Sequence, residues 1–484
     1  MKKILCLVCA AIFVLFAVSL SACKKEESKR TTYDIECAFS DNKLVGKEKV
    51  KFFNNTENSF SVLKFNLFAN AYRRDARYKP IADAYAYKAY PNGESFGEID
   101  IKKVTSGDEN IEFEICGEDK NILAIPLSEE VFPEECAEVT IEYEITLANV
   151  VARTGYNANT VNLANFYPIL CAIDENGFFE CVYYSCGDPY FSDCADYKVT
   201  FSAPTEFTVA ASGKAISEKA ENGVTEYTYE LSSARSFCIV LSTKYESISC
   251  ETDGVTVNYY YYDDETPAIS MEYAVNSLKL FSSLFGKYPY GTFSVTQTEF
   301  IQGGMEFPCL VMISDELTDN SYREVIVHET AHQWWQTTVG NNEINYGFLD
   351  EGLAEYSTVL FYENYPEYGL SREDMIKSSE QTYKTYCTVY DKLFGGADTT
   401  MTRSLGEFTS EYEYVNIAYV KSCIMYDTLR KTIGEEKFFG GLKKYYADYS
   451  FLNAKPCDLV GSFVKCGADA EGFFDGFFDG KVII

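Results

Sequence analysis

The segment from Val325 to Trp335 reads VIVHETAHQWW and contains the only two histidines of the 484-residue chain. His328 and His332 are four positions apart, so on a helix their imidazoles project from one face and can bind one cation. Glu329 follows the first histidine directly and can reach the same cavity, where it would act as general base toward water. Because paired imidazoles suit zinc, the pattern predicts a hydrolytic zinc site.

Two hydrated histidines on a surface helix would have the same spacing, but the flanking residues argue against this alternative. Ile326, Ala331 and Trp334 are apolar, so the helix is predicted to lie inside its domain. Imidazoles without partners would be costly there. Burial therefore favours a bound metal over two solvated side chains.

A second predicted helix, FLDEGLAEYSTVLFYE, supplies a third ligand. The chain between His332 and Glu351 is long enough to end the first helix near Gly340, turn, and bring Glu351 back to the metal. Two histidines and one glutamate leave the fourth position of one zinc ion per chain open, as catalytic zinc requires. Glu355, one turn beyond Glu351, either orients a histidine or is an exposed helix residue.

The elements that must position these residues divide the chain into two parts. Residues 31–250 contain short alternating runs such as KEKVKFF and VTIEYEITL separated by turn residues, which predicts an antiparallel β domain. Residues 251–484 begin with a strand in TVNYYYYDDE and continue with AISMEYAVNSLKLFSSLFG, whose apolar spacing is helical. Further helices are expected at about 320–338, 350–364, 371–387, 415–432 and 435–449, which makes this second domain α+β and mainly helical.

Composition excludes one class of partner. The formal net charge is −31, and no run of Lys and Arg offsets it locally, so nucleic-acid binding is not expected. The acidity is interpreted first as a solvated exterior and only second as a preference for basic substrates. With 46% hydrophobic residues the chain can bury sizeable cores.

The N-terminus has the pattern of an export signal. Two lysines precede an apolar run from Ile4 to Leu20, and small residues then precede Cys23, so residues 1–22 are predicted to be a signal peptide. The tetrad LSAC resembles the bacterial lipoprotein cleavage box, which implies lipidation of Cys23, a polar tether over residues 23–30 and a membrane-anchored protein exposed outside the cytoplasm. An uncleaved anchor or a plain signal peptide are the alternatives.

Fourteen of the 17 cysteines lie beyond Cys23. Export permits disulfides among them, while an organism living without oxygen could keep them as thiols. A local group is formed by Cys171, Cys181, Cys186 and Cys194. It could pair internally, and its spacing lacks the paired C-x-x-C form of a second zinc site.

His328, Glu329, His332 and Glu351 match the spacing of the gluzincins, and the motif GGMEF over 303–307 resembles the exopeptidase motif of the membrane alanyl aminopeptidase family. This resemblance implies an α+β multidomain fold in which an antiparallel, saddle-like β domain precedes a thermolysin-like, mainly helical catalytic domain. It also implies a zinc-dependent aminopeptidase that acts on peptides.

The resemblance assigns roles within GGMEF and beyond. Glu306 would bind the free α-amine of the substrate, with Gly303, Gly304 and Met305 contacting the peptide. Tyr419, two residues before a lysine in AYVKS, would stabilise the oxyanion. Tyr414 is the alternative for that role, and the family's second amine-binding residue, from the N-terminal domain, has no identifiable counterpart.

Other functions stay open at this stage. The same zinc site could belong to an endopeptidase or to a hydrolase of another bond. A non-catalytic surface protein that binds a partner through its β domain is a third alternative, and the complete ligand set with Glu329 argues against it.

Overall fold

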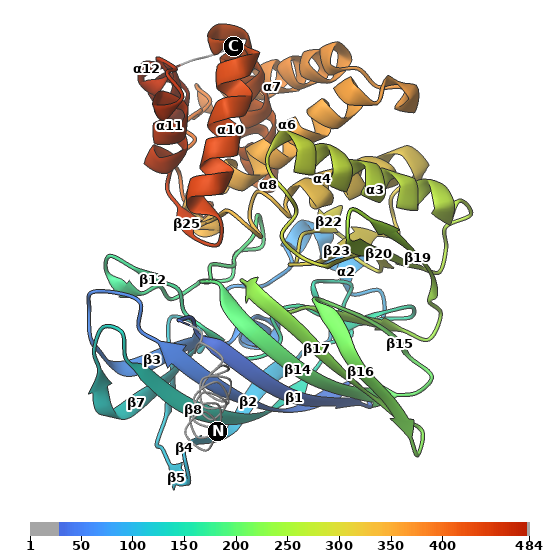
Figure 1. The fold of residues 1–484 in the computed structure, drawn as a ribbon, viewed down its shortest axis with the longest axis vertical. Helices are drawn as coiled ribbons and strands as arrows, with labels where there is room; N and C mark the ends of the chain where they lie inside the picture. Colours follow the sequence, from blue (N-terminus) through green and yellow to red (C-terminus); the bar gives the residue numbers. More distant parts are fainter. Residues whose placement is uncertain (1–28, 482–484) are drawn as a thin grey trace, which may run out of the picture.

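The computed structural model describes residues 29–481. The β-rich N-terminal half lies below the helical half in Figure 1, and the strands β19 to β23 lie between them. The predicted signal peptide and Cys23 lie outside the described residues. Within 29–481, no helix combines the length and the hydropathy needed to cross a bilayer.

An eight-stranded sheet forms the base of the N-terminal domain. Its inward side chains alternate with exposed ones, as in β1, where Tyr33, Ile35, Cys37 and Phe39 are buried and their neighbours face solvent. All pairs are antiparallel except β1 with β14. The strands in sheet order are β16 (Lys214–Glu221), β17 (Val224–Ala234), β14 (Ala195–Pro204), β1 (Thr32–Ser40), β2 (Lys43–Phe53), β8 (Cys136–Thr146), β4 (Glu98–Ser106) and β5 (Glu109–Asn110).

Two four-stranded sheets pack on this base and carry the loops that reach the second domain. The first contains β15 (Thr208–Ala211), β18 (Ile239–Ser242), β10 (Val161–Leu163) and β9 (Thr154–Tyr156). The second contains β11 (Ile169–Leu170), β3 (Phe60–Asn66), β7 (Ile122–Val131) and β6 (Glu114–Cys116). The β domain expected over 31–250 is therefore built from these three sheets and a two-stranded sheet of β12 (Ile173–Asp174) and β13 (Gly177–Phe178).

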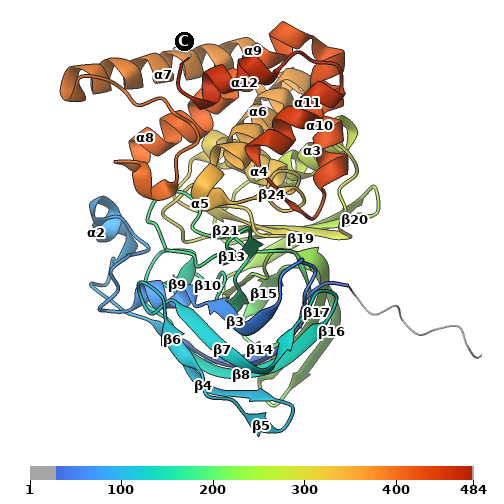
Figure 2. The same ribbon diagram turned by 90° about the vertical axis from the view of Figure 1, so that its left-hand side faces the viewer.

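The second domain starts with a five-stranded sheet, whose first strand begins at Glu246. Its strands are β19 (Glu246–Thr252), β20 (Val255–Tyr261), β21 (Thr292–Thr298), β23 (Leu310–Ser314) and the edge strand β22 (Gly304–Met305). Figure 2 shows α7 to α12 gathered on the side of this sheet away from the β domain. The helices are α3 (Pro267–Leu284), α4 (Asp319–Ala331), α5 (Glu343–Tyr346), α6 (Phe348–Asn364), α7 (Arg372–Phe394), α8 (Glu411–Val415), α9 (Ser422–Ile433), α10 (Glu435–Tyr449), α11 (Pro456–Lys465) and α12 (Glu471–Phe478).

Two helix predictions need correction. The helix expected over 320–338 ends at Ala331, because the next residues turn back and the N–H of Thr337 donates to the carbonyl of His332 at 3.0 Å. The helix expected over 415–432 is interrupted by a π-helical turn, η5 (Asn416–Lys421), between α8 and α9. Both irregularities fall beside the site, where strained or widened turns are common.

Arg235 ties the two domains together beneath the site. Its Nε donates to the carbonyl of Gln336 at 2.7 Å and its guanidinium also reaches the carbonyl of Leu452 at 2.7 Å. Gly340 lies against this guanidinium, where any Cβ would approach within 2.0 Å of the Arg235 Cζ atom. A fixed domain interface follows, which keeps the N-terminal loops in place over the catalytic half.

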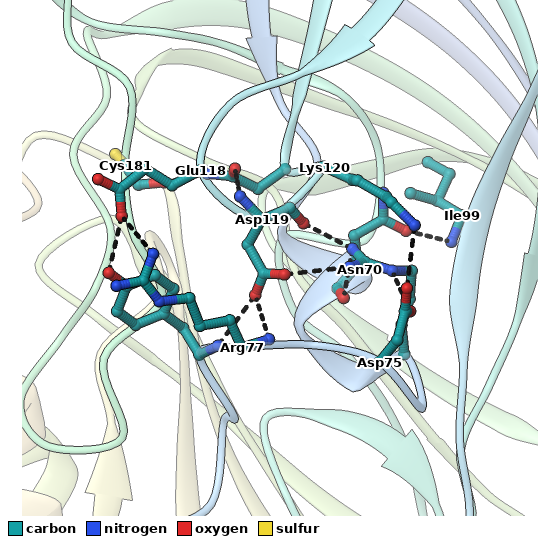
Figure 3. Close-up of polar contacts among 11 residues, drawn as sticks. Asn70, Asp75, Arg77, Ile99, Glu118, Asp119, Lys120 and Cys181 are labelled. Carbon is teal, nitrogen blue, oxygen red and sulfur yellow. Dashed lines mark hydrogen bonds and ion pairs between the residues drawn. The ribbon is translucent and has the colours of Figure 1, made fainter.

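A long loop between β3 and β4 carries residues to the mouth of the cleft. Asp119 fixes its base: the carboxylate accepts hydrogen bonds from the backbone N–H groups of Arg77 and Tyr78, both at 2.9 Å, and from the Arg73 guanidinium at 3.1 Å (Figure 3). Beyond this anchor the loop continues into α2 (Ala86–Ala89), preceded by Tyr85, which lines the catalytic cavity.

The fourteen cysteines within 29–481 are all free thiols in the structure. Seven of them are buried, and burial raises the pKa of the thiols, as for Cys181 to about 12 and Cys309 to about 12. The buried cysteines serve as apolar packing residues in this structure, which corresponds to the thiol alternative.

Candidate zinc centre

Three side chains from α4 and α6 converge on one point. The Nε2 atoms of His328 and His332 are 3.1 Å apart, and the Oε2 atom of Glu351 lies 3.3 Å from the first and 3.2 Å from the second. The His332 and Glu351 side chains are only 1% and 3% exposed. The two histidines and the distant glutamate predicted as ligands are therefore brought together.

The contacts of the Nδ1 atoms of the two histidines determine which ring nitrogens face the predicted metal position. The Nδ1 atom of His332 lies 2.9 Å from the carbonyl oxygen of Trp335, and the Nδ1 atom of His328 lies 3.2 Å from the Glu355 carboxylate. Both acceptors require a proton on Nδ1, which leaves the two Nε2 lone pairs free for a metal. Of the two alternatives for Glu355, the structure supports the one in which it orients a histidine.

The donor set fits zinc. A tetrahedral zinc ion about 2.0–2.2 Å from its nitrogen and oxygen ligands places those atoms about 3.3 Å from each other, and the three observed separations are 3.1–3.3 Å. The carboxylate balances part of the cation charge in a buried site. Within 29–481, the side-chain groups close enough together to hold a metal consist of His, Asp and Glu residues.

Glu329 lies in the same cavity as the predicted ligands. Its side chain is 5% exposed, and its Oε2 atom has no hydrogen-bond partner among the described residues. Burial raises the pKa of Glu329 to about 8, and a cation bound by the histidines would lower it again by favouring the carboxylate. An unpaired carboxylate at this place can accept a proton from water.

Tyr419 is aimed at the site by the π-helical turn. Its hydroxyl donates a hydrogen bond to the Oε1 atom of Glu351, and its ring stacks 5.9 Å from the ring of His328. Tyr414 also lines the cavity, but its hydroxyl points toward Gly347. Tyr419 is therefore the better placed of the two donors, because it alone contacts a metal ligand.

The lysine two residues after this tyrosine has a different task. Lys421 is fully buried, and its Nζ donates to the carbonyls of Thr399 and Phe477, at 2.5 and 2.6 Å. It thus joins the π-helical turn to α12 and faces away from the cavity. In the AYVKS segment, Tyr419 therefore lines the cavity, and Lys421 stabilises the π-helical turn.

The motif GGMEF runs along the edge of the five-stranded sheet. Gly303, Gly304 and Glu306 line the cavity, and Glu306 is 3% exposed with its Oε1 atom lacking a partner among the described residues. The Met305 side chain points elsewhere: it is buried and its sulfur lies 3.1 Å from the Nε atom of Arg153. The substrate contact expected of this residue can therefore come only from its backbone.

The N-terminal domain contributes a carboxylate that sequence reasoning missed. Asp188 lines the cavity, is 6% exposed, and pairs with Arg153 at 2.5 Å. Burial raises the pKa of Asp188 to about 8, although the adjacent Arg153 opposes this shift. The only local signal is the turn-forming GDP sequence, which does not distinguish this residue among 73 acidic ones.

These residues surround one cavity of about 420 Å³ between the two domains. The metal ligands and Glu329 line it, and Glu306, Asp188 and Arg153 line it beside them. The volume is that of a small-molecule or short-peptide site. The cavity therefore combines side chains able to hold a metal, an unpaired carboxylate, a tyrosine hydroxyl and a group of buried acidic residues.

Comparison with known proteins supports this interpretation. The peptidase family M1 domain matches residues 269–477. Aminopeptidase M1-D from Oryza sativa subsp. japonica is 24% identical over 325 residues, covering 63% of this chain and 35% of that protein. Aminopeptidase B from Rattus norvegicus is 29% identical over 180 residues, covering 34% of this chain and 26% of that protein. The chain thus spans about a third or less of these relatives.

Solved structures share the whole two-domain fold. An M1 zinc metallopeptidase from Deinococcus radiodurans superposes with a TM-score of 0.68 at 16% identity and covers 94% of this chain and 95% of its own. A mutant of an M1 zinc metallopeptidase from this organism, bound to a Tyr-Ser-Ala substrate, gives a TM-score of 0.67 at 15% identity, covering 94% and 95%. The predicted histidine and glutamate ligands all lie within residues 269–477, the segment that is similar to the peptidase family M1 domain.

Proposed function

We propose that this protein is a zinc-dependent aminopeptidase that removes N-terminal residues from peptides. The observation that carries the proposal is the pair of buried carboxylates in the cavity lining, Glu306 and Asp188, of which Glu306 clusters with the ligand His332. Two buried carboxylates at that place can bind a free α-ammonium group and so fix the first peptide bond over the centre. An internal segment of a polypeptide has no such charge to offer.

The residues of this chain divide the chemistry among them. When bound, zinc supplies a Lewis acid that polarises the peptide carbonyl and lowers the pKa of water. Glu329 removes a proton from the attacking water and delivers it to the leaving nitrogen. The Tyr419 hydroxyl donates to the carbonyl oxygen as negative charge develops there. Arg153 holds Asp188 in place by its ion pair and keeps it from being a bare buried charge.

The decisive experiment compares free and blocked amines. The purified protein, with its zinc content measured, should cleave Ala-Ala-Ala and leave N-acetylated Ala-Ala-Ala almost intact, because acetylation removes the charge that Glu306 binds. Glu329→Gln should retain zinc and lose nearly all turnover. Equal cleavage of both peptides would favour the endopeptidase alternative, and protein that binds no zinc would favour the non-catalytic alternative.

We further propose that the mature protein is a lipoprotein tethered to a bacterial membrane through Cys23, with the enzyme outside the cytoplasm. The support is the N-terminal sequence alone, in which an apolar run precedes LSAC. A lipid on Cys23 would hold the cavity near peptides arriving from the surroundings. Replacing Cys23 by Ser should move the protein from the membrane fraction to the soluble fraction, and an unchanged distribution would refute lipidation.

A further inference from the structure

The two ends of the catalytic cavity differ in how their charges are balanced. At the Asp188 end, Arg153 neutralises one carboxylate. At the other end, the cavity is lined by Glu324, Val325 and Glu355, with no cationic side chain among them. Arg153 is the single Arg or Lys that lines the cavity in the described part of the chain. The second end is therefore left with uncompensated negative charge.

Glu324 is the residue that makes this end unusual. It is partly buried, yet within residues 29–481 it makes no hydrogen bond and no ion pair. Burial, followed by the nearby Glu355 carboxylate, raises the pKa of Glu324. Glu355 already uses one oxygen to orient His328 and is 31% exposed. Partial burial of a carboxylate without a partner carries a desolvation cost, which a cationic group brought by the substrate would offset.

The position of Glu324 along α4 relates it to the course of the substrate. Glu306, which would bind the amine, clusters with His332 and Glu329 toward the C-terminal end of α4. Glu324 is one turn before His328, so it lies about 6 Å further along the helix axis in the opposite direction. A peptide whose amine is at Glu306 passes the metal ligands and then reaches Glu324.

The distance between His328 and Glu324 along α4 indicates which residue of the peptide lies beside Glu324. An extended chain advances about 3.3–3.6 Å per residue, so the residue after the cleaved bond is the first one to come level with Glu324. A lysine or arginine side chain at that position is long enough to reach the carboxylate while its aliphatic part lies along Val325.

We infer that Glu324, supported by Glu355, selects substrates with lysine or arginine as the second residue, immediately after the bond that is cleaved. This inference rests on the proposed aminopeptidase function and adds the class of peptide. The guest cation gives Glu324 the partner it lacks and relieves its repulsion from Glu355. The net negative charge of the chain suggests a preference for basic substrates, and this inference assigns that preference to one residue of the cavity, Glu324.

The test uses two peptides that differ in one charge, Ala-Lys-Ala and Ala-Met-Ala, with the zinc-loaded wild-type protein. We expect kcat/KM to favour the lysine peptide about tenfold, equivalent to about 1.4 kcal/mol. Glu324→Gln should bring this ratio close to one, and Glu324→Lys should invert preference, so that Ala-Glu-Ala is cleaved faster than Ala-Lys-Ala. Glu411→Gln is the matched control, since Glu411 lines the same cavity near Tyr85, and its ratio should stay near ten.

The outcomes separate this inference from the function on which it rests. Equal cleavage of the two peptides by the wild-type protein, or a Glu324→Gln variant that keeps the tenfold ratio, overturns the selection by Glu324 and leaves the aminopeptidase intact. Cleavage of neither peptide by zinc-loaded protein overturns both. Loss of the ratio in Glu411→Gln would also overturn the inference, because it would show a general effect of cavity charge.

Discussion

Adding one methyl group at Gly304 should lower the activity of the protein while leaving its stability unchanged. A Cβ atom there would lie 2.3 Å from the Oε1 atom of Glu329 and 2.6 Å from its Cδ and Cγ atoms, whereas ordinary contacts begin at 3.4 Å. The Gly304→Ala variant must therefore displace the carboxylate by about 1 Å. A displacement of this size at a reacting group costs about a hundredfold in rate, or about 2.7 kcal/mol in the activation free energy.

The fold should tolerate the same change. The Glu329 Oε2 atom has no hydrogen bond to lose among the described residues, and Gly304 is not one of the glycines with positive φ. We therefore expect Gly304→Ala to keep its melting temperature and zinc content while kcat on Ala-Ala-Ala falls about a hundredfold. Gly303→Ala is the control, because its new Cβ would meet nothing closer than 3.7 Å. Wild-type kcat in Gly304→Ala would refute the claim that this glycine makes room for the base.

Three further changes test the other groups in steady-state kinetics and metal analysis. Tyr419→Phe should lower kcat about a hundredfold or more with little change in KM, since it removes a donor to the developing oxyanion; an effect on KM alone would contradict that role. Glu306→Ala should raise KM for free-amine peptides far more than for acetylated ones, and equal effects would reject amine binding. Glu355→Ala should weaken zinc affinity about tenfold to a hundredfold, because His328 loses the acceptor of its Nδ1 proton; unchanged affinity in a competition titration would reject this contact.

The parts of the site set by local spacing were predictable from the sequence. His328 and His332 must share a helix face whatever surrounds them, and a second amphipathic segment at short distance can only return Glu351 to the same place. The alternating pattern of the N-terminal half likewise determines a β class without tertiary information. The organisation into two domains, with a β-rich half before a helical half, follows from the same patterns.

The parts that depend on distant segments were not predictable. Asp188 enters the cavity only because Arg235 and other interface contacts place its loop over the catalytic half. The end of α4 at Ala331 depends on tertiary contacts of the turn that follows, in which the Trp334 indole N–H donates to the carbonyl of Gly286 at 2.7 Å. Helical periodicity continues through this turn in the sequence, so pattern alone overestimates the helix.

The π-helical turn orients two side chains that a regular helix could not place correctly at the same time. In an uninterrupted helix from Glu411 to Ile433, Tyr419 and Lys421 would differ by a fixed 200° and could not both be adjusted to their partners. The wider turn over Asn416–Lys421 lets Tyr419 face Glu351 while Lys421 stays buried against the carbonyl of Phe477. The lysine thereby couples the position of the Tyr419 hydroxyl to the docking of α12. Loosening α12 should for this reason disturb kcat before it unfolds the domain.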